Sequence, residues 1–219
     1  VSIASDFSNH IDYFLSENDQ GIYDAMNKGI LNCSGEYVIF LNSGDCFYNN
    51  SVLSNIFDII NNVSVADIIY GNFYSFDNEL KFGELRISRP LNQLFKGMIF
   101  SHQSCFIRSS LLKMHPFDLN YPIAADYNMI YSLYLNNNYF INSNVCISTT
   151  NKDGISYLNP YTLIDYRKIS FKFNKSIIVY IYHTFNIIIL FIVNKVGNYF
   201  GPYPLLTYRN IKRKISLWM

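Results

Sequence analysis

The feature that most constrains the fold is an alternation of short apolar runs with helix-periodic segments in the first half of the chain. Residues 21–33 place small and apolar side chains at the i, i+3, i+4 and i+8 positions of one helix face. Residues 36–42, EYVIFLN, form a nearly continuous apolar run, which is typical of a strand buried on both faces. Strand–helix–strand alternation of this kind predicts an α/β protein with a mostly parallel sheet.

The same patterns extend through the chain to residue 149. Ser51 precedes a helix-periodic segment and is a candidate N-cap, and residues 73–82 are typical of a β-hairpin. The other predicted strands are residues 11–17, 66–72, 104–108 and 140–149, and the other predicted helices are residues 51–62, 91–98 and 126–136.

Charge divides the chain into two parts. Residues 1–165 hold all 16 acidic residues and 8 of the 17 basic ones, whereas residues 166–219 hold nine basic residues and no acid. We therefore predict an acidic globular domain over residues 1–165 and a basic, apolar helical tail over residues 166–219. The net charge of +1 gives no indication of nucleic-acid binding. The four cysteines are widely spaced, which favours a reducing cytoplasmic location over a zinc or disulfide framework.

The tail contains a long apolar run. Residues 177–193 carry no charge, but they are slightly fewer than the ~20 residues that a spanning helix needs, and His183, Thr184 and Asn186 interrupt them. Lysines flank the run, and residues 208–219 add four more basic residues. This pattern predicts an interfacial helix that basic neighbours hold on an anionic membrane surface. A helix packed on the domain or on a second subunit is the alternative, and a true span is the least favoured.

A polar turn, Asn42 to Asp45, follows the predicted strand over residues 36–42. In open α/β sheets, ligands bind beyond the carboxyl ends of the strands. A carboxylate there, with little side-chain bulk around it, suits a hard divalent cation that carries phosphate oxygens. The same residues are also ordinary turn formers, so the turn alone does not distinguish a binding site from a loop.

The segment SENDQGIYDAMNKGILNCSGEYVIFLNSGD, residues 16–45, resembles the donor-binding half of family 2 glycosyltransferases of the GT-A fold. The family's helix pattern G-x-x-x-A-x-N-x-G is matched by Gly21, Ala25, Asn27 and Gly29, and a G-E-Y strand and an acidic turn follow. The segments SHQSCFIRSSLL, FDLNYPIAADYNMIYSL and DGIS then come in family order. The resemblance covers residues 10–160 and is closest to the bacterial branch that builds capsular, exopolysaccharide and O-antigen units.

This resemblance implies a GT-A, Rossmann-like fold that is incomplete at the N-terminus, because the family's opening strand–helix–strand has no counterpart here. About 60 residues are expected to be missing, judged from the usual size of two βα units. Two departures concern the site. Met26 stands where the family often has Arg, and Asn42 and Gly44 stand where it often has further acids, which leaves Asp45 as the only carboxylate of the turn.

The resemblance also implies an inverting sugar transfer from a nucleotide-diphosphate sugar to a saccharide or lipid-linked acceptor. Asp45 is then the predicted ligand of a divalent metal, Mn²⁺ or Mg²⁺, which compensates the charge of the leaving diphosphate. Asp19 is either a helix cap or a ribose contact, and a solvated surface lysine is the alternative for Lys28. The predicted donor-binding residues are Asp19, Asp24, Asn27, Lys28 and Asn42.

On the acceptor side, Asp126 matches the family's catalytic base, and an N-cap of the 126–136 helix is its alternative role. His102 matches a position near the acceptor and the diphosphate, with a structural histidine as the equal alternative. Residues 152–156, KDGIS, are predicted to close over the site as a mobile loop with Gly154 as its hinge.

Two other functions remain open at this point. A nucleotidyltransferase would share an α/β nucleotide-binding layout, but it would need a Gly-rich basic phosphate loop near its start. A non-catalytic saccharide-binding or assembly subunit would agree with the loss of acids from the turn. The preferred interpretation is a bacterial glycosyltransferase of surface polysaccharide biosynthesis, cytoplasmic and peripheral on the inner face of the plasma membrane.

Overall fold

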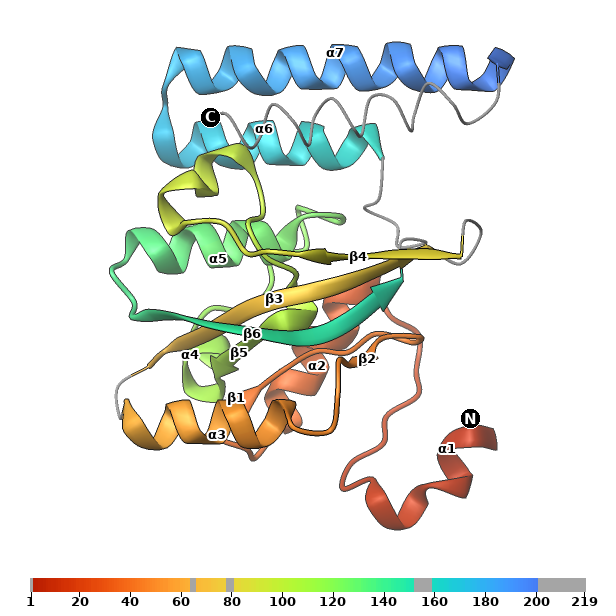
Figure 1. Ribbon diagram of the computed structural model, residues 1–219, viewed down its shortest axis with the longest axis vertical. Coiled ribbons are helices and arrows are strands. Elements are labelled where there is room, and N and C mark those ends of the chain that lie inside the picture. The colour runs from red at the N-terminus through yellow and green to blue at the C-terminus, as the bar shows by residue number, and fades with distance from the viewer. Residues whose placement is uncertain (1, 64–65, 78–80, 152–158, 201–219) are drawn as a thin grey trace.

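A curled mixed sheet forms the centre of the molecule in a computed structural model that describes residues 2–63, 66–77, 81–151 and 159–200 (Figure 1). The strands are β1 (Tyr37–Val38), β2 (Cys46–Phe47), β3 (Ile68–Asp77), β4 (Phe82–Arg86), β5 (Cys105–Arg108) and β6 (Phe140–Asn151). The helices are α1 (Ser2–Asp6), α2 (Ile22–Asn32), α3 (Val52–Asn62), α4 (Ser109–Met114), α5 (Ala125–Leu135), α6 (Pro160–Asn174) and α7 (Ile177–Phe200). Three short 3₁₀ helices are η1 (Ser8–His10), η2 (Leu91–Lys96) and η3 (His102–Ser104).

The strand order is β1-β5-β3-β6-β2, and β4 pairs with β3 as a hairpin. Among the described residues only β3 and β6 are parallel, and every other pairing is antiparallel. The α/β class and the GT-A-like architecture are confirmed, but the expected mostly parallel pairing is wrong. Continuous apolar runs are typical of parallel strands because helices cover both faces of such sheets, but an antiparallel strand with helices on both faces is buried in the same way.

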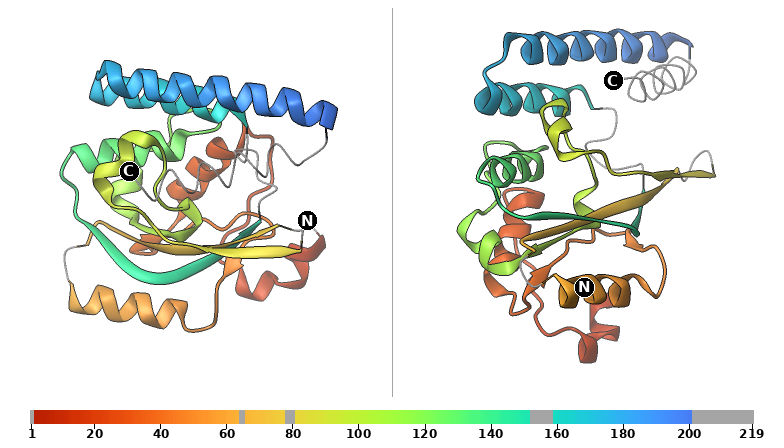
Figure 2. Two further views of the ribbon diagram at one scale, coloured as in Figure 1. Left: turned by 45° about the horizontal axis from the view of Figure 1, so that its top comes forward. Right: turned by 60° about the vertical axis from the view of Figure 1, so that its left-hand side comes forward.

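Helices cover both faces of the sheet (Figures 1 and 2). On one side α5, α6 and α7 are stacked in that order, and α3 lies on the other side. The larger core lies between the sheet and α2, α4, α5 and α6, whereas the smaller one lies under α3 around Val52, Ile56 and Ile147. The globular part of the chain therefore has the layered helix–sheet–helix build of α/β proteins.

Most predicted elements are present, with two corrections. The helices over residues 21–33, 51–62 and 126–136 and the β3–β4 hairpin are confirmed. Residues 11–17 form no strand, since residues 11–20 are exposed and have no regular structure. The 36–42 strand is shorter than expected, because only Tyr37 and Val38 pair, with Arg108 and Ile107 of β5. Ser51 does occupy the N-cap of α3, but its side chain makes no capping hydrogen bond.

The tail begins as a pair of helices that lie side by side (Figure 2). Lys175 takes the left-handed conformation, with φ of 52°, and ends α6 so that the chain can reverse into α7. The buried His183 imidazole lies against the domain, with Nε2 2.8 Å from the carbonyl oxygen of Phe95. Helix α6 runs without a break across residue 165, and the division of the chain at that position stays a prediction.

The hydroxyl of Tyr127 ties three elements together inside the core. It donates to the Leu94 carbonyl of η2 at 2.6 Å and lies 2.7 Å from Ser170 Oγ on α6. Burial raises the pKa of Tyr127, so the group stays protonated and available as a donor. Because α5 also carries the candidate base, this buried contact fixes the helix on which the site depends.

Tyr127→Phe should lower the free energy of unfolding by about 1–2 kcal/mol, because the Leu94 carbonyl would lose a buried donor. Urea unfolding followed by circular dichroism measures the change. Tyr161→Phe, at an exposed position on α6, is the matched control and should leave the midpoint unchanged. Equal midpoints for Tyr127→Phe and the wild type would contradict this role.

Candidate functional site

The site lies where β1 ends and β5 begins. These strands are antiparallel, with Tyr37 opposite Arg108 and Val38 opposite Ile107. Each step from Val38 toward Asn42 is therefore matched by a step from Ile107 back toward η3, which holds His102 and Gln103. The register brings together two segments that are 60 residues apart in the chain.

The acidic turn is a tight reversal that requires glycine. The Asp45 backbone N–H donates to the Asn42 carbonyl at 2.9 Å, which closes a β-turn with Gly44 at its third position. Gly44 has φ of 89°, and a Cβ atom there would lie 2.9 Å from Asn151 Nδ2. A side chain at residue 44 is thus disfavoured by both conformation and space, and the turn presents Asp45 without neighbouring bulk.

The Asp45 carboxylate is held by three donors. Gln103 Nε2 donates to Oδ2 at 2.9 Å, the Asn42 backbone N–H donates to Oδ2 at 3.3 Å, and the Asn151 backbone N–H donates to Oδ1 at 3.3 Å. Gln103 is in turn fixed by the Ser101 hydroxyl, which donates to its Oε1. Since these donors come from three different elements, the carboxylate has a defined orientation.

His102 and Asp126 form a contact between η3 and the first turn of α5. His102 Nδ1 lies 3.2 Å from Asp126 Oδ2, and His102 Nε2 lies 3.4 Å from Asn42 Nδ2. If Nδ1 carries the proton toward the carboxylate, Nε2 is left as an acceptor for the Asn42 amide, so one tautomer satisfies both contacts. The structure therefore links Asp126, His102, Asn42 and Asp45 in one chain of contacts.

Asp126 does not cap α5. The N-cap position is Ala124, and Asp126 follows two residues later with 13% of its side chain exposed. Burial alone would raise the pKa of Asp126, but the hydrogen bond from His102, the positive charge of that ring when it is protonated, and the hydrogen bond from Tyr23 outweigh burial and hold the pKa below its usual value. The carboxyl is therefore ionised at neutral pH, and the alternative role as an N-cap does not hold.

Tyr23, on the buried face of α2, is the second partner of Asp126. Its hydroxyl lies 2.8 Å from Asp126 Oδ1 and 3.0 Å from the Ile123 carbonyl. Burial, followed by the nearby Asp126 charge, raises the pKa of Tyr23, so the phenol remains a donor. With Tyr23 on one oxygen and His102 on the other, the plane of the Asp126 carboxylate is fixed.

Asn27 has a structural role in this arrangement. Its Nδ2 donates to the Phe117 carbonyl at 2.9 Å, and its Oδ1 accepts from the Phe117 backbone N–H at 2.8 Å. This amide pair attaches α2 to the segment that leads into α5. Both polar ends of the side chain are thus engaged within the chain, and a donor contact by Asn27 stays a prediction.

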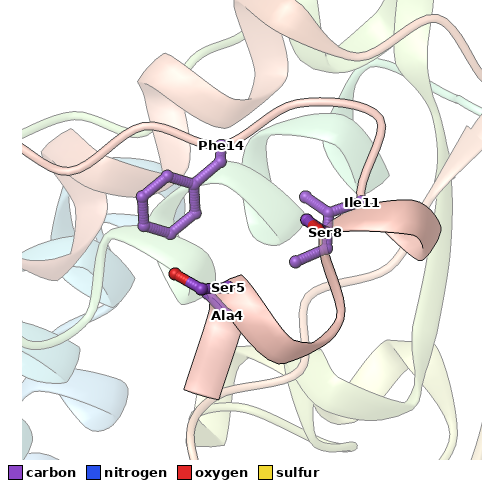
Figure 3. A pocket seen from close by; sticks show the side chains of 5 residues that line it. All are labelled: Ala4, Ser5, Ser8, Ile11 and Phe14. Carbon is purple, nitrogen blue, oxygen red and sulfur yellow. The ribbon is translucent and has the colours of Figure 1, made fainter. Parts of the chain in front are cut away.

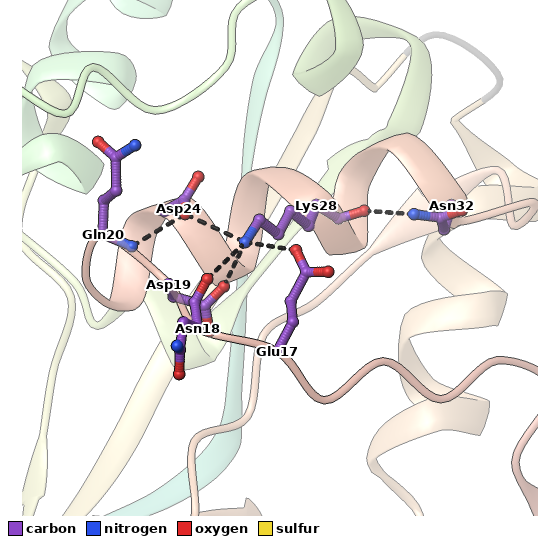
Figure 4. Close-up of polar contacts among 7 residues, drawn as sticks. All are labelled: Glu17, Asn18, Asp19, Gln20, Asp24, Lys28 and Asn32. Atoms are coloured by element: carbon purple, nitrogen blue, oxygen red, sulfur yellow. Dashed lines mark hydrogen bonds and ion pairs between the residues drawn. The ribbon is translucent and has the colours of Figure 1, made fainter.

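Lys28, in the middle of α2, is surrounded by carboxylates from the first turn of the helix and from the segment before it (Figure 4). Its Nζ lies 2.7 Å from Glu17, 2.7 Å from Asp19 and 3.2 Å from Asp24. These hydrogen bonds, Asp19 first, raise the pKa of Lys28, while the Gln20 backbone N–H leads the causes that lower the pKa of Asp24. Asp19 is no helix cap, because the N-cap of α2 is Gly21. This cluster of Lys28 with three acids contains three of the five predicted donor-binding residues.

A small pocket lies elsewhere, in the N-terminal segment (Figure 3). Its walls are the side chains of Ala4, Ser5, Ser8, Ile11 and Phe14, and none of them belongs to the predicted site. The pocket therefore adds nothing to the chemistry at Asp126. The predicted closing loop, residues 152–156, lies outside the described residues.

The groups around Asp45 decide whether the expected divalent metal ion would fit there. Within the described part of the chain, no group of three or more His, Cys, Asp or Glu side chains could hold an ion. A carboxylate has about four lone-pair positions, so the three donors to Asp45 leave one free. Mg²⁺ is often bound through one or two carboxylates together with substrate phosphates and water. The residues fit an ion of that kind and do not form a protein-only metal site.

Comparison with known proteins identifies the family. The family model described as "Glycosyl transferase family 2" matches residues 1–123, which is more than half of the chain. The chain belongs to glycosyl transferase family 2.

Curated relatives of this family 2 chain carry consistent names. A "PGL/p-HBAD biosynthesis glycosyltransferase" of Mycobacterium tuberculosis is 28% identical over 113 residues, which cover 51% of this chain and 43% of that protein. An "Uncharacterized glycosyltransferase" of the same species is 33% identical over 122 residues, covering 54% of this chain and 46% of that one. The matched segments thus span less than half of each of these relatives.

A solved structure supports the fold of the family 2 chain. The crystal structure of residues 1–349 of TarS from S. aureus superposes with a TM-score of 0.57 at 16% identity, covering 92% of this chain and 59% of that one. At this identity the likeness concerns the fold alone. It agrees with the layered α/β architecture described above.

Sequence reasoning missed three members of the site: Tyr23, Gln103 and Asn151. Tyr23 looks like a core residue of an amphipathic helix, and its hydroxyl partner is 103 residues away. Gln103 and Asn151 flank predicted strands, and their contacts with Asp45 depend on sheet order. The one available signal was the placement of Gln103 beside His102.

Tyr23→Phe should raise the pKa of Asp126 relative to the wild type, because it removes a hydrogen bond that favours the ionised carboxyl. Protonation of Asp126 would then begin at a higher pH on acidification. Carboxyl ¹³C chemical shifts followed over a pH titration measure this pKa directly. Tyr13→Phe, at an exposed position, is the control, and an unchanged Asp126 titration in Tyr23→Phe would contradict the contact.

Proposed function

We propose that this chain is part of an enzyme that transfers a sugar from a nucleotide-diphosphate sugar to a saccharide or lipid-linked saccharide acceptor, with inversion at the anomeric carbon. Membership of glycosyl transferase family 2 supports the reaction class. The observation that carries the proposal is the Asp126–His102 contact at 3.2 Å, beside the turn that presents Asp45. It supports the proposal because the oriented Asp126 carboxylate and the Asp45 carboxylate both lie near the edge of the sheet where β1 ends.

Asp126 is the proposed general base. An inverting single displacement needs one base on the acceptor side and no covalent nucleophile on the donor side. Tyr23 and His102 each engage one oxygen of Asp126, and the remaining lone pairs of the carboxylate can accept the proton of the attacking hydroxyl. The lowered pKa of Asp126 keeps the group ionised before the reaction, so it is ready to accept a proton at neutral pH.

His102 and Asn42 are proposed to line the path between acceptor and donor. His102 is oriented through Nδ1 by Asp126, which leaves Nε2 on the side of Asn42. In this position His102 contacts the acceptor or the diphosphate, and Asn42 orients the donor sugar. The cluster around Lys28 is proposed to receive the nucleotide, through Asp19 and Asp24 as acceptors for hydroxyl or base N–H groups.

Asp45 is the proposed ligand of the divalent cation, Mn²⁺ or Mg²⁺, that the family resemblance implies. Bound there, the ion would supply charge compensation for the leaving diphosphate. Gln103 and Asn151 hold the carboxylate in place for that role. The two departures from the family pattern, Asn42 and Gly44, make Asp45 the only acid of the turn, so the proposal depends on this residue alone.

The proposed setting is bacterial surface polysaccharide biosynthesis at the inner face of the plasma membrane. A curated relative is named for PGL/p-HBAD biosynthesis, and its 28% identity over 113 residues supports a glycosyltransferase of a biosynthetic pathway without defining the acceptor. A lipid-linked acceptor would require the enzyme to work close to a bilayer. The basic tail is consistent with that requirement.

Asp45→Asn should weaken metal-dependent donor binding, because it removes the only carboxylate of the turn and keeps its shape. Calorimetry with nucleoside diphosphate and Mn²⁺, on protein expressed with any sequence that precedes Val1 in its gene, should show at least about 10-fold lower affinity. Affinity without metal should not change. Equal affinity in the presence of Mn²⁺ would remove Asp45 from the metal site.

Asp126→Asn should lower turnover by at least about 100-fold and leave donor affinity near normal, because an amide cannot accept a proton at neutral pH. A thermal-shift screen of nucleotide sugars identifies the donor, and release of nucleoside diphosphate measures turnover. Asp58→Asn, an exposed acid on α3, is the matched control and should be as active as the wild type.

Three other results would point elsewhere. Normal turnover by Asp126→Asn would leave the base on another residue. Retention of anomeric configuration in the product would exclude the single displacement. Donor binding without any turnover by the wild type, over a panel of acceptors, would favour a non-catalytic saccharide-binding subunit.

A further inference from the structure

The outer face of α7 is a continuous apolar stripe that the described chain leaves exposed. Helix α7 is the outermost layer of the molecule (Figure 1). Ile178 is 75% exposed, Ile181 59% and Phe185 62%, and the same spacing of three and four residues continues through Ile188 and Ile192. These five residues, the outer stripe, lie on one side of the helix because such spacing keeps side chains on one face. Exposed apolar stripes of this length mark interaction surfaces.

The opposite face of α7 is packed on the domain. Val179, His183, Ile187 and Leu190 are buried, and they repeat with helical spacing on the side away from the outer stripe. His183 is 1% exposed and lies against the Phe95 carbonyl, while Arg167 of α6 donates to Thr184 Oγ1 at 3.3 Å. The helix is therefore anchored through this inner face, and the outer stripe points away from the domain.

Positive charge brackets the outer stripe. Lys175 is exposed in the turn before α7, and Lys195 is exposed three residues beyond Ile192, in line with the stripe. The sequence holds no acidic residue after Asp165. An apolar stripe between cations matches a surface whose apolar interior is covered by anionic headgroups.

We propose that the outer stripe of α7 binds the surface of an anionic lipid bilayer, with the helix axis parallel to the membrane and the inner face still on the domain. This proposal deepens the proposed function. It rests on that function in one respect, namely that the acceptor is lipid-linked. In a two-fold pairing of this face, the stripe and its bracketing lysines would meet the same surface of a second copy, so like charges would come together.

A spanning orientation is disfavoured by the packing of α7. The stretch Ile177–Val196 has a mean hydropathy of 2.0 and by length and composition alone could cross a membrane. Crossing would pull His183 from the Phe95 carbonyl and separate Val179, Ile187 and Leu190 from the domain. A surface orientation buries the exposed apolar side chains and keeps all these contacts.

Vesicle co-sedimentation of the whole chain tests the proposal. Vesicles of phosphatidylcholine alone are compared with vesicles that also contain phosphatidylglycerol, at low and high salt. The test variant is Ile181→Gln with Phe185→Gln, and the control is Leu53→Gln with Phe57→Gln, an exposed pair at the same spacing on α3. Thermal unfolding of both variants checks that each is folded.

The wild type should bind the anionic vesicles, bind neutral ones weakly, and lose binding as salt screens the charges. The double variant Ile181→Gln with Phe185→Gln should bind at least about 10-fold more weakly. It lacks two apolar side chains whose burial in the bilayer would favour binding. The control pair should bind like the wild type. A second variant, Lys175→Gln with Lys195→Gln, should bind more weakly and with less dependence on salt.

Two results would overturn the proposal. One is a wild type that does not bind anionic vesicles, or an outer-stripe variant that binds as well as the wild type. The other is a wild-type dimer by light scattering that the outer-stripe variant converts to a monomer, since the stripe would then join two copies. Neither measurement involves a nucleotide, so donor titration of the same proteins judges the glycosyltransferase proposal separately.

Discussion

The antiparallel position of β5 between β1 and β3 is the constraint on which the rest of the site depends. Because β5 runs against β1, its first residues lie at the edge where β1 leads into the acidic turn. That register sets His102 beside Asn42 and Gln103 beside Asp45. A parallel β5 would have put its opening residues at the far edge of the sheet, and these contacts would not exist.

Helix α2 connects this arrangement to Asp126. One turn of the helix carries both Tyr23, which contacts Asp126, and Asn27, which fastens the backbone at Phe117. The chain between Phe117 and Asp126 is thus held at both ends by the same helix. The carboxylate is oriented by Tyr23, which is 103 residues away in the chain, and by His102 of η3, while the N-cap position of α5 is Ala124.

The sequence predicts helices and sites here better than it predicts strand pairing. The periodicity of residues 21–33 and 126–136 was sufficient for α2 and α5, because a helix is a local structure. The direction of β5 depends on which strands it pairs with, and these are distant in the sequence. Residues 11–17 have a strand-like composition, but they form no strand. The order of motifs brought Asn42, Asp45, His102 and Asp126 into one hypothesis, whereas Tyr23 could not be separated from ordinary core tyrosines by any local pattern.

The cluster around Lys28 has one further consequence for what can approach α2. The N-terminus of a helix ordinarily attracts anions through its unpaired N–H groups and dipole. Here Asp24 already accepts from the Gln20 backbone N–H, and three carboxylates share the single ammonium group of Lys28. The local field at this end of α2 is therefore negative, which repels phosphate and favours neutral groups that donate hydrogen bonds. A ligand that carries both hydroxyl groups and a phosphate would therefore bind in one orientation, with its hydroxyls toward α2 and its phosphate away from α2.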